Sequence, residues 1–256
     1  MIGVFDSGIG GLTVVKELRR FVPSQSILYF GDTARVPWGN KSPEIVRRYC
    51  DEICEFLISN NISEIVIACN TASAVATDHL KDKFRGVEIH NIIDPCVEVV
   101  NEKQFEKIGI IGTRGTISSG VYEEKIKKLN KGQKVFSTEC PLFVPLAEEG
   151  WESEDISLRI AKKYLSPLKE TNIDALILGC THYPLLESVI RRAIGDGVEI
   201  ISSAVEIAKK MSVHGKTEKN TSQDRFCFSD VDEHSKKIAN RIFHGKLFME
   251  EVILHK

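Results

Sequence analysis

The 256-residue sequence has no long apolar run and no excess of charge of either sign. None of its apolar stretches approaches the roughly 20 residues that a membrane-spanning helix needs. The formal net charge is −2, so the composition indicates no nucleic-acid partner and no acidic-membrane partner. The start, MIGVFDSGIGG, lacks the basic segment and the cleavage site of a signal peptide, and it predicts the first strand of a cytoplasmic protein.

The seven cysteines form no C-x-x-C pair, and their number is odd. Both features argue against a disulfide framework and against a four-cysteine zinc site. Reduced cysteines of this kind are usually small core residues, and Cys50 and Cys54, one helical turn apart, fit that description. The informative cysteines are those that stand beside polar residues at the end of an apolar run.

Short apolar runs alternate with amphipathic stretches along nearly the whole chain. Most runs lack period-2 alternation, which is typical of strands buried on both faces, and the alternation predicts an α/β fold with mainly parallel sheet. We predict strands at Ile2–Phe5, Ile27–Phe30, Glu64–Ala68, Val87–His90, Lys107–Ile111, Lys134–Ser137, Asp174–Leu178, Val198–Ile201 and Arg225–Phe228. We predict helices at Leu12–Phe21, Glu44–Ser59, Ala72–Phe84, Val121–Leu129, Asp155–Glu170, Leu185–Ala193 and Ala204–Val213.

Two of the predicted strands end alike, in EIVIACNTAS around Cys69 and in DALILGCTHYP around Cys180. Each strand places a cysteine at its carboxyl end, ahead of polar residues and then a helix. We therefore predict two similar α/β domains with mainly parallel sheets that face each other across a central active-site cleft. Chance resemblance between two buried strands is the alternative.

The predicted domains are discontinuous in sequence. The first spans residues 1–92 plus 207–256 and contains Asp6 and Cys69. The second spans residues 93–206 and contains Glu148, Cys180 and His182. The predicted crossovers lie near residues 91–95 and 202–204, and no low-complexity linker separates the two domains.

A glycine-rich loop, DSGIGG at residues 6–11, follows the first predicted strand. Glycines let the backbone approach a ligand, and the N-terminus of the next helix attracts anions. The spacing is not the G-x-G-x-x-G of a dinucleotide site, and no Gly-Lys-Ser/Thr follows as in a P-loop. We interpret the loop as a site for a small anion such as a carboxylate, with a plain strand-to-helix turn as the alternative.

Polar residues surround both strand-end cysteines. Cys69 precedes Asn70 and Thr71 at the start of a helix, where the dipole and free N–H groups stabilise a thiolate. Cys180 precedes Thr181 and His182, and a nearby imidazole tunes a thiol. A Cys-x-His pair also occurs in metal sites, but two further ligands at ordinary spacing are not evident. A buried core cysteine is the alternative at each position.

Two further segments are weaker candidates. Pro37-Trp38-Gly39 belongs to a loop after the second strand that lines a pocket or lies on the surface. Glu148 follows the apolar run at 142–146, and an acid in that position either enters a cleft or is solvated.

Two matched thiols suit one kind of chemistry. A cysteine hydrolase uses one nucleophile, a base and an oxyanion hole, so a second equivalent thiol has no role in it. Inversion at a carbon that bears an acidic proton needs two acid/base groups, one on each face. We hypothesise that Cys69 and Cys180 are these groups, in opposite protonation states during each turnover.

Three motifs resemble those of the glutamate racemase family: DSGIGGL at 6–12, ACNTASA at 68–74 and GCTHYPLL at 179–186. They stand in the family's order and spacing, and the resemblance runs from residue 1 to about residue 213. PWG at 37–39 is similar to a fourth motif, in which the family usually has tyrosine at the position of Trp38. That replacement removes a hydroxyl and leaves only backbone contacts to carry over.

The resemblance implies a homodimer that interconverts L- and D-glutamate without pyridoxal phosphate, metal or nucleotide, and that supplies D-glutamate for peptidoglycan. It implies that Cys69 and Cys180 are the acid/base residues, assisted by Asp6, His182 and Glu148. It implies substrate contacts at Asp6, Ser7, Trp38, Gly39, Asn70, Thr71, Thr181 and His182. Ser202 and Ser203 stand where the family often has an Asp-Ser/Gly turn, and no role is assigned to them.

Two other functions stay open at this point. A related two-cysteine isomerase that acts on aspartate or a hydantoin shares the same thiol chemistry, although the Thr-His-Tyr-Pro ending favours glutamate. A non-catalytic binding module that has kept the pocket is the second alternative, and the presence of all four residues Asp6, Cys69, Cys180 and His182 argues against it.

The sequence offers no convincing metal-ligand set and no lysine in a Schiff-base context. We therefore expect the purified protein to contain neither a metal nor pyridoxal phosphate, as measured by elemental analysis and by absorbance. Activity that disappears on exhaustive chelation and returns with an added metal would overturn this expectation.

Overall fold

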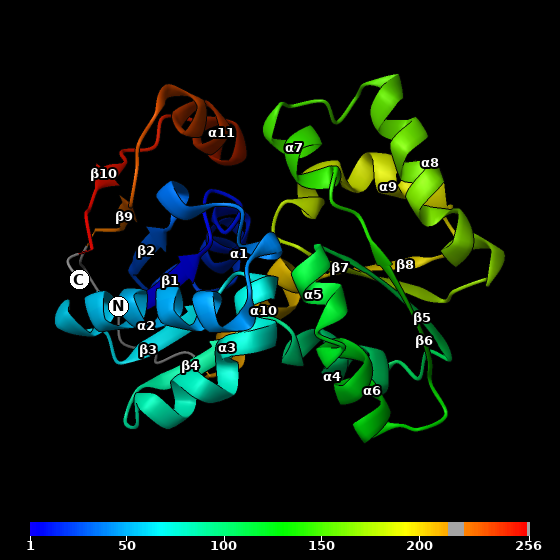
Figure 1. Ribbon diagram of the computed structural model, residues 1–256, viewed down its shortest axis with the longest axis horizontal. Helices are drawn as coiled ribbons and strands as arrows, with labels where there is room; N and C mark the ends of the chain where they lie inside the picture. The colour runs from blue at the N-terminus through cyan, green and yellow to red at the C-terminus, as the bar shows by residue number, and fades with distance from the viewer. Residues whose placement is uncertain (215–222, 255–256) are drawn as a thin grey trace.

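The computed structural model describes residues 1–214 and 223–254, so part of the predicted segment 207–256 lies outside the described residues. The predicted α/β class is confirmed, because two sheets of parallel strands alternate with helices (Figure 1). None of the described helices is both long and apolar enough to cross a membrane.

Each sheet forms the centre of one half of the molecule. The first has the strand order β10-β9-β2-β1-β3-β4 and the second the order β6-β5-β7-β8. The strands are β1 (Ile2–Asp6), β2 (Ile27–Gly31), β3 (Glu64–Ile67), β4 (Glu88–Asn91), β5 (Lys107–Gly112), β6 (Lys134–Glu139), β7 (Ala175–Gly179), β8 (Glu199–Ser202), β9 (Arg225–Phe228) and β10 (Glu250–Glu251).

Helices cover both faces of each sheet. The α-helices are α1 (Leu12–Phe21), α2 (Pro43–Ser59), α3 (Asn70–Lys83), α4 (Asp94–Glu102), α5 (Arg114–Ser118), α6 (Val121–Leu129), α7 (Phe143–Glu148), α8 (Asp155–Glu170), α9 (Glu187–Ile194), α10 (Ser203–His214) and α11 (Glu233–Phe243). The 3-10 helices are η1 (Thr33–Arg35), η2 (Trp38–Asn40) and η3 (Tyr183–Leu186).

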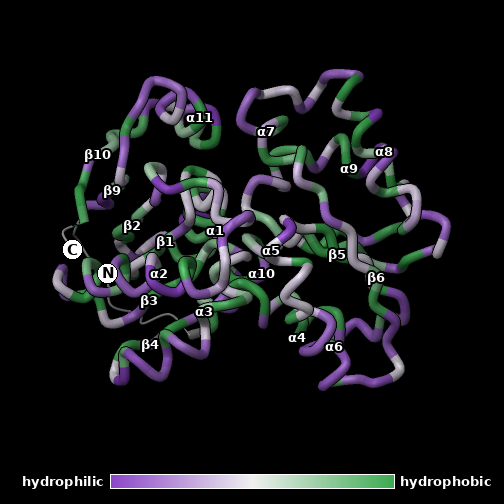
Figure 2. Tube along the Cα trace, in the orientation of Figure 1, coloured by the Kyte–Doolittle hydropathy of each residue, from purple (hydrophilic) through white to green (hydrophobic). Residues whose placement is uncertain are grey.

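Local sequence signals explain where α2 begins and how the helices pack. At α2, Ser42 accepts a hydrogen bond from the Ile45 amide at 3.4 Å, and Pro43 occupies the first turn, where its missing N–H costs nothing. Along the outer helices, hydrophilic and hydrophobic residues alternate (Figure 2). Their apolar sides pack on the sheets in four buried clusters, one on each face of each sheet.

The two sheets repeat one strand order, because β2-β1-β3-β4 in the first corresponds to β6-β5-β7-β8 in the second. In the first sheet β2 lies on one side of β1 and β3 lies on the other. In the second sheet β6 and β7 lie on opposite sides of β5 in the same way. This arrangement creates a topological switch point between β1 and β3, and another between β5 and β7. Ligands of open α/β sheets bind at the carboxyl ends of strands at such points.

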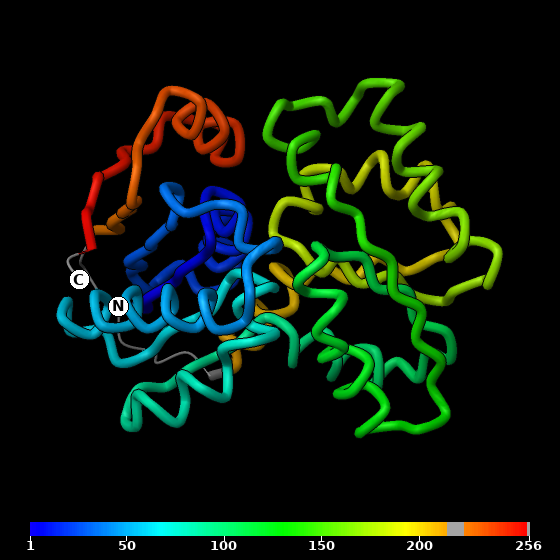
Figure 3. Tube along the Cα trace, viewed as in Figure 1, coloured from blue at the N-terminus to red at the C-terminus, as the bar shows by residue number. Residues whose placement is uncertain are grey.

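The chain crosses between the halves and returns. Figure 3 shows the beginning and the end of the chain in one half and the middle of the chain in the other. Helix α10 follows β8 of the second sheet and packs against α1 of the first half. The exact domain boundaries at residues 92/93 and 206/207 stay a prediction.

The end of β2 packs closely on the glycine-rich loop. A Cβ atom on Gly31 would lie 2.4 Å from the carbonyl oxygen of Gly8 and 2.7 Å from Cδ1 of Phe228. We expect Gly31→Ala to lower the free energy of unfolding by roughly 2 kcal/mol, as overpacking does. Gly197→Ala, where a Cβ would meet nothing within 4 Å, is the control and is expected to change it by less than about 0.5 kcal/mol. Equal urea denaturation curves for the two variants would refute this close contact.

Candidate active site

A cavity of about 290 Å³ lies between the two halves, at the carboxyl ends of β3 and β7. Residues of both halves line it, including every predicted site residue except Asp6. The lining residues are Ser7, Gly8, Ile9, Val36, Pro37, Trp38, Gly39, Cys69, Asn70, Thr71, Thr113, Val144, Pro145, Glu148, Gly179, Cys180, Thr181 and His182.

Cys69 contributes its thiol from the first half. It is the N-cap of α3, and its Sγ accepts a hydrogen bond from the Ala72 amide at 3.5 Å and lies 3.5 Å from Ser7 Oγ, to which the thiol donates. Burial raises the pKa of Cys69 to about 12, and the charge of Asp6 adds to the rise. The Ala72 amide and Ser7 lower this pKa, as expected at a helix N-terminus. Burial outweighs these two hydrogen bonds, so the pKa of Cys69 stays above its usual value.

Cys180 contributes the second thiol, from the other half. Its Sγ lies 4.0 Å from Nδ1 of His182, and Nε2 of the same ring lies 3.0 Å from Oε1 of Glu148. Burial lowers the pKa of His182, but the hydrogen bonds to Cys180 and Glu148 outweigh it and raise this pKa to about 10. Burial raises the pKa of Glu148, and His182 reverses the effect, so that the carboxyl is ionised more readily than usual. An imidazolium therefore stands beside Cys180 at neutral pH.

Asp6 lies behind the cavity wall. Its side chain is fully buried, and Oδ2 accepts hydrogen bonds from the amides of Gly8 at 3.1 Å and Gly11 at 2.9 Å. The carboxylate that binds to the glycine-rich loop is thus the protein's own. Thr181 Oγ1 donates to Asp6 Oδ1 at 3.5 Å, which ties the first half to the segment that contains the second thiol.

The residues after Cys69 join a network of hydroxyl groups. Asn70 Nδ2 donates to the Tyr122 hydroxyl at 3.0 Å, while Asn70 Oδ1 has no hydrogen-bond partner among the described residues. Thr71 Oγ1 lies 2.9 Å from Thr113 Oγ1 and 3.2 Å from Thr116 Oγ1. Three hydroxyl groups thus gather beside the cavity, where they can bind an anionic oxygen.

Trp38 and Gly39 lie where the loop after β2 closes the cavity. The Trp38 ring is buried and packs at a centroid distance of 5.6 Å from Tyr49. A Cβ on Gly39 would lie 2.7 Å from Cβ of Thr113, so this loop touches the second half directly.

Several residues at the site escaped prediction from the sequence. Thr113 follows β5 as Cys180 follows β7, and the polar residues after the apolar run at 107–112 were the available signal. Val144 and Pro145 line the cavity from α7, a helix too short to show periodicity. Ser203, to which no role was assigned, donates to the Leu178 carbonyl at 3.1 Å and accepts from Asn70 at 3.4 Å.

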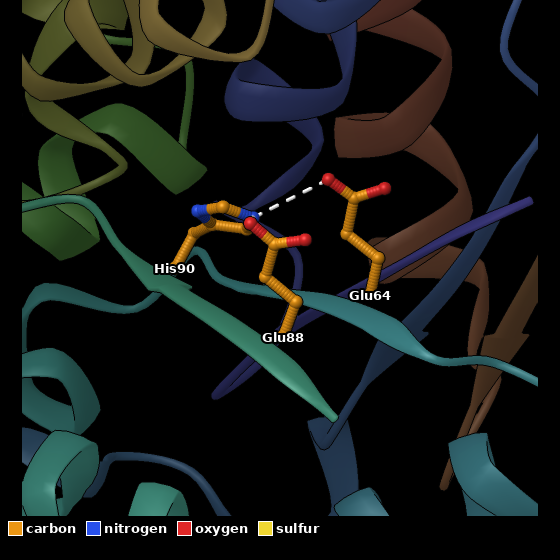
Figure 4. Close-up of side chains that lie close together, drawn as sticks. All are labelled: Glu64, Glu88 and His90. Atoms are coloured by element: carbon orange, nitrogen blue, oxygen red, sulfur yellow. Dashed lines mark ion pairs between the residues drawn. The ribbon is translucent and has the colours of Figure 1, made fainter. Parts of the chain in front are cut away.

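Glu64, Glu88 and His90 form a cluster of possible metal ligands in the described part of the chain, and their ligand atoms lie within 4.8 Å of one another. His90 Nε2 lies 3.3 Å from Glu64 Oε1 and 3.4 Å from Glu88 Oε1 (Figure 4). Parallel pairing sets Glu64 opposite Glu88, and the imidazole of His90 faces both carboxylates. The cluster stands at the amino ends of β3 and β4, away from the cavity.

Comparison with known proteins places the chain among racemases. Residues 11–211 match the model of the Asp/Glu/Hydantoin racemase family. A glutamate racemase from Geobacter metallireducens is 44% identical over 253 residues, which cover 96% of this chain and 93% of that protein.

Two solved structures share the fold over nearly their whole length. A glutamate racemase from Bacillus anthracis has a TM-score of 0.93 and 38% identity, covering 99% of this chain and 97% of the other. A glutamate racemase from Francisella tularensis, solved in complex with D-glutamate, has a TM-score of 0.91 and 35% identity, covering 98% of this chain and 96% of the other.

The two thiols are expected to differ in reactivity although they are equally accessible, with 5% of Cys69 and 6% of Cys180 exposed. At pH 7 we expect iodoacetamide to alkylate Cys180 about tenfold faster than Cys69 or more, because the thiolate is the nucleophile and His182 favours it at Cys180. Peptide mass spectrometry measures both rates. His182→Asn should remove most of the difference, and His79→Asn, which alters a histidine paired with Asp51, should not. Faster alkylation of Cys69 would contradict this electrostatic asymmetry.

Proposed function

The chain belongs to the Asp/Glu/Hydantoin racemase family, and we propose that it interconverts L- and D-glutamate through proton transfer by Cys69 and Cys180. The observation that supports this most directly is the geometry of the cavity. Two thiols from corresponding strand ends of the two halves line one space. This arrangement gives each face of a bound α-carbon its own acid/base group.

The proposed reaction moves two protons. One cysteine, as thiolate, removes the proton from the α-carbon and becomes a thiol, leaving a carbanion. The other cysteine, as thiol, gives its proton to the opposite face and becomes a thiolate. The reverse reaction exchanges these roles, so no electron donor or acceptor is required.

We propose that the resting enzyme holds Cys180 as the thiolate and Cys69 as the thiol. The imidazolium of His182, 4.0 Å from Cys180 and fixed by Glu148, supports a negative charge at Cys180. The high pKa of Cys69, which arises from burial and from the charge of Asp6, supports a proton there. Cys69 becomes a thiolate only after it has given up this proton, and Ser7 and the Ala72 amide then stabilise the charge.

The lining of the cavity supports a small amino acid as substrate. Among the described lining residues there is no lysine or arginine, and His182 is the one basic side chain. Carboxylate oxygens would therefore bind to hydroxyl groups and backbone amides, such as those of Thr71 and Thr113. The free Oδ1 of Asn70 suits an ammonium group.

Glutamate is preferred to aspartate or a hydantoin because the relatives with high identity over most of their length are glutamate racemases. The same proposal includes a cytoplasmic homodimer that supplies D-glutamate for peptidoglycan.

The direct test is an assay with L-glutamate or L-aspartate and no added cofactor, followed by circular dichroism of the amino acid. We expect loss of optical activity with glutamate. Cys69→Ser and Cys180→Ser should each lower kcat by about 10²- to 10⁴-fold, the usual contribution of a general acid or base, because serine is a far weaker acid.

Cys227→Ser is the matched control, since Cys227 is buried outside the cavity with its Sγ 3.7 Å from Glu250 Oε2. It should keep nearly full activity, and thermal melting checks that all three variants are folded. Near-wild-type turnover in either Cys69→Ser or Cys180→Ser would refute the two-thiol mechanism. Turnover of aspartate alone would refute the assignment of substrate.

A further inference from the structure

Helix α11 of the first half faces the end of α7 in the second half (Figure 1). The side chain of Arg241, on α11, reaches from this helix to α7. Its Nη2 donates to the carbonyl oxygens of Ala147 and of Glu148, the latter at 3.2 Å. These are the last two residues of α7, and Glu148 is the carboxylate that pairs with His182.

The end of α7 leaves the carbonyl of Glu148 without a partner in the backbone pattern that closes the helix. Gly150 adopts a left-handed conformation with φ of 75°, its amide donates to Ala147 O at 3.3 Å, and the Trp151 amide donates to Leu146 O at 3.0 Å. This pair of bonds is the Schellman pattern, which does not provide a donor for the carbonyl of Glu148. Arg241 provides one, and a cation at a helix C-terminus is further favoured by the helix dipole.

The contact is closely fitted. A Cβ on Gly150 would lie 2.3 Å from Nη1 of Arg241, so the guanidinium lies directly on the backbone that ends α7. On the other side, Ile238, Ala239 and Ile242 of α11 are buried in the core of the first half. Arg241 therefore connects a firmly packed helix of one half to a short helix of the other.

Helix α7 is also a wall of the cavity, because Val144, Pro145 and Glu148 line it. His234, also on α11, acts on the same carboxylate. Burial raises the pKa of Glu148, whereas the hydrogen bond and charge of His182 and the charge of His234 lower it. The position of α7 thus determines where Glu148 meets His182 and how far the wall stands from a bound substrate.

We propose that Arg241 is a positioning residue for the racemase reaction: by binding the end of α7 it holds Glu148 against His182. It touches neither the substrate nor the thiols. Its effect on turnover passes through Glu148, and this inference rests on the function proposed above.

Kinetics of a double-mutant cycle test this dependence. Arg241→Met, which keeps an apolar stem without the guanidinium donors, should lower kcat/KM about tenfold in both directions, the size expected for one lost hydrogen bond to a charged group. Arg241→Lys should recover part of the loss. In a Glu148→Gln background, Arg241→Met should cost less than about twofold, because the residue that it positions has already lost its charge.

Lys237→Met is the matched control, since Lys237 is an exposed cation one turn earlier on α11. It should change kcat/KM by less than about twofold, as surface substitutions usually do. Equal losses from Arg241→Met in the wild-type and Glu148→Gln backgrounds would overturn the proposal, and so would an Arg241→Met enzyme with wild-type kinetics.

Hydrogen–deuterium exchange supplies a readout that does not depend on catalysis. In the ligand-free protein, Arg241→Met should speed exchange of peptides that cover residues 143–151, whereas Lys237→Met should not. Unchanged exchange in this segment would refute the contact in solution, whatever the enzyme does. If the wild-type protein fails to racemise glutamate but the exchange result holds, the proposed function fails and the contact between the halves stands.

Discussion

The site depends on how closely the glycine-rich loop of the first half approaches the segment after β7 of the second. A Cβ on Gly10 would lie 2.5 Å from both Nδ1 of His182 and Oγ1 of Thr181, so nothing larger than hydrogen fits there. Thr13 Oγ1 donates to the Thr181 carbonyl at 2.8 Å, and the Asp6 carboxylate accepts from the Thr181 hydroxyl. These contacts connect the carboxyl ends of two separate sheets and bring together the segments that lie beside the two thiols.

The halves repeat one strand order, but their surroundings are not equivalent. Cys69 is a helix N-cap near the buried charge of Asp6, and burial keeps it protonated. Cys180 faces an imidazole that Glu148 orients. A repeated architecture therefore supplies two thiols at corresponding positions, with different side chains behind them. The proposed proton relay uses this difference, because it needs one protonated and one ionised thiol at the start of each turnover.

Much of the fold could be predicted from local pattern. Buried parallel strands are continuous apolar runs, and so the ends of the strands before Cys69 and Cys180 were evident. Helix α4 was missed because its first residues fall in the crossover predicted at residues 91–95, although proline is tolerated in the first turn where Pro95 lies. Helix α7 contains Pro145 and has only six residues, too few for a 3.6-residue period to show.

Contacts between distant parts of the chain were beyond sequence reasoning. Arg241 meets Glu148 at a separation of 93 residues, and no local pattern signals that contact. The glycine-rich loop was predicted to bind a carboxylate, and tertiary structure alone reveals that the carboxylate of Asp6 takes two of its amides.

The most direct test of two opposed thiols is racemisation of L-glutamate in deuterium oxide, followed by mass spectrometry of each enantiomer at low conversion. If one thiol removes the α-proton and the other delivers a solvent-derived deuteron, the D-glutamate formed carries deuterium at the α-carbon while the remaining L-glutamate carries none. Product that keeps the original α-hydrogen, or early deuterium in the remaining substrate, would contradict the account.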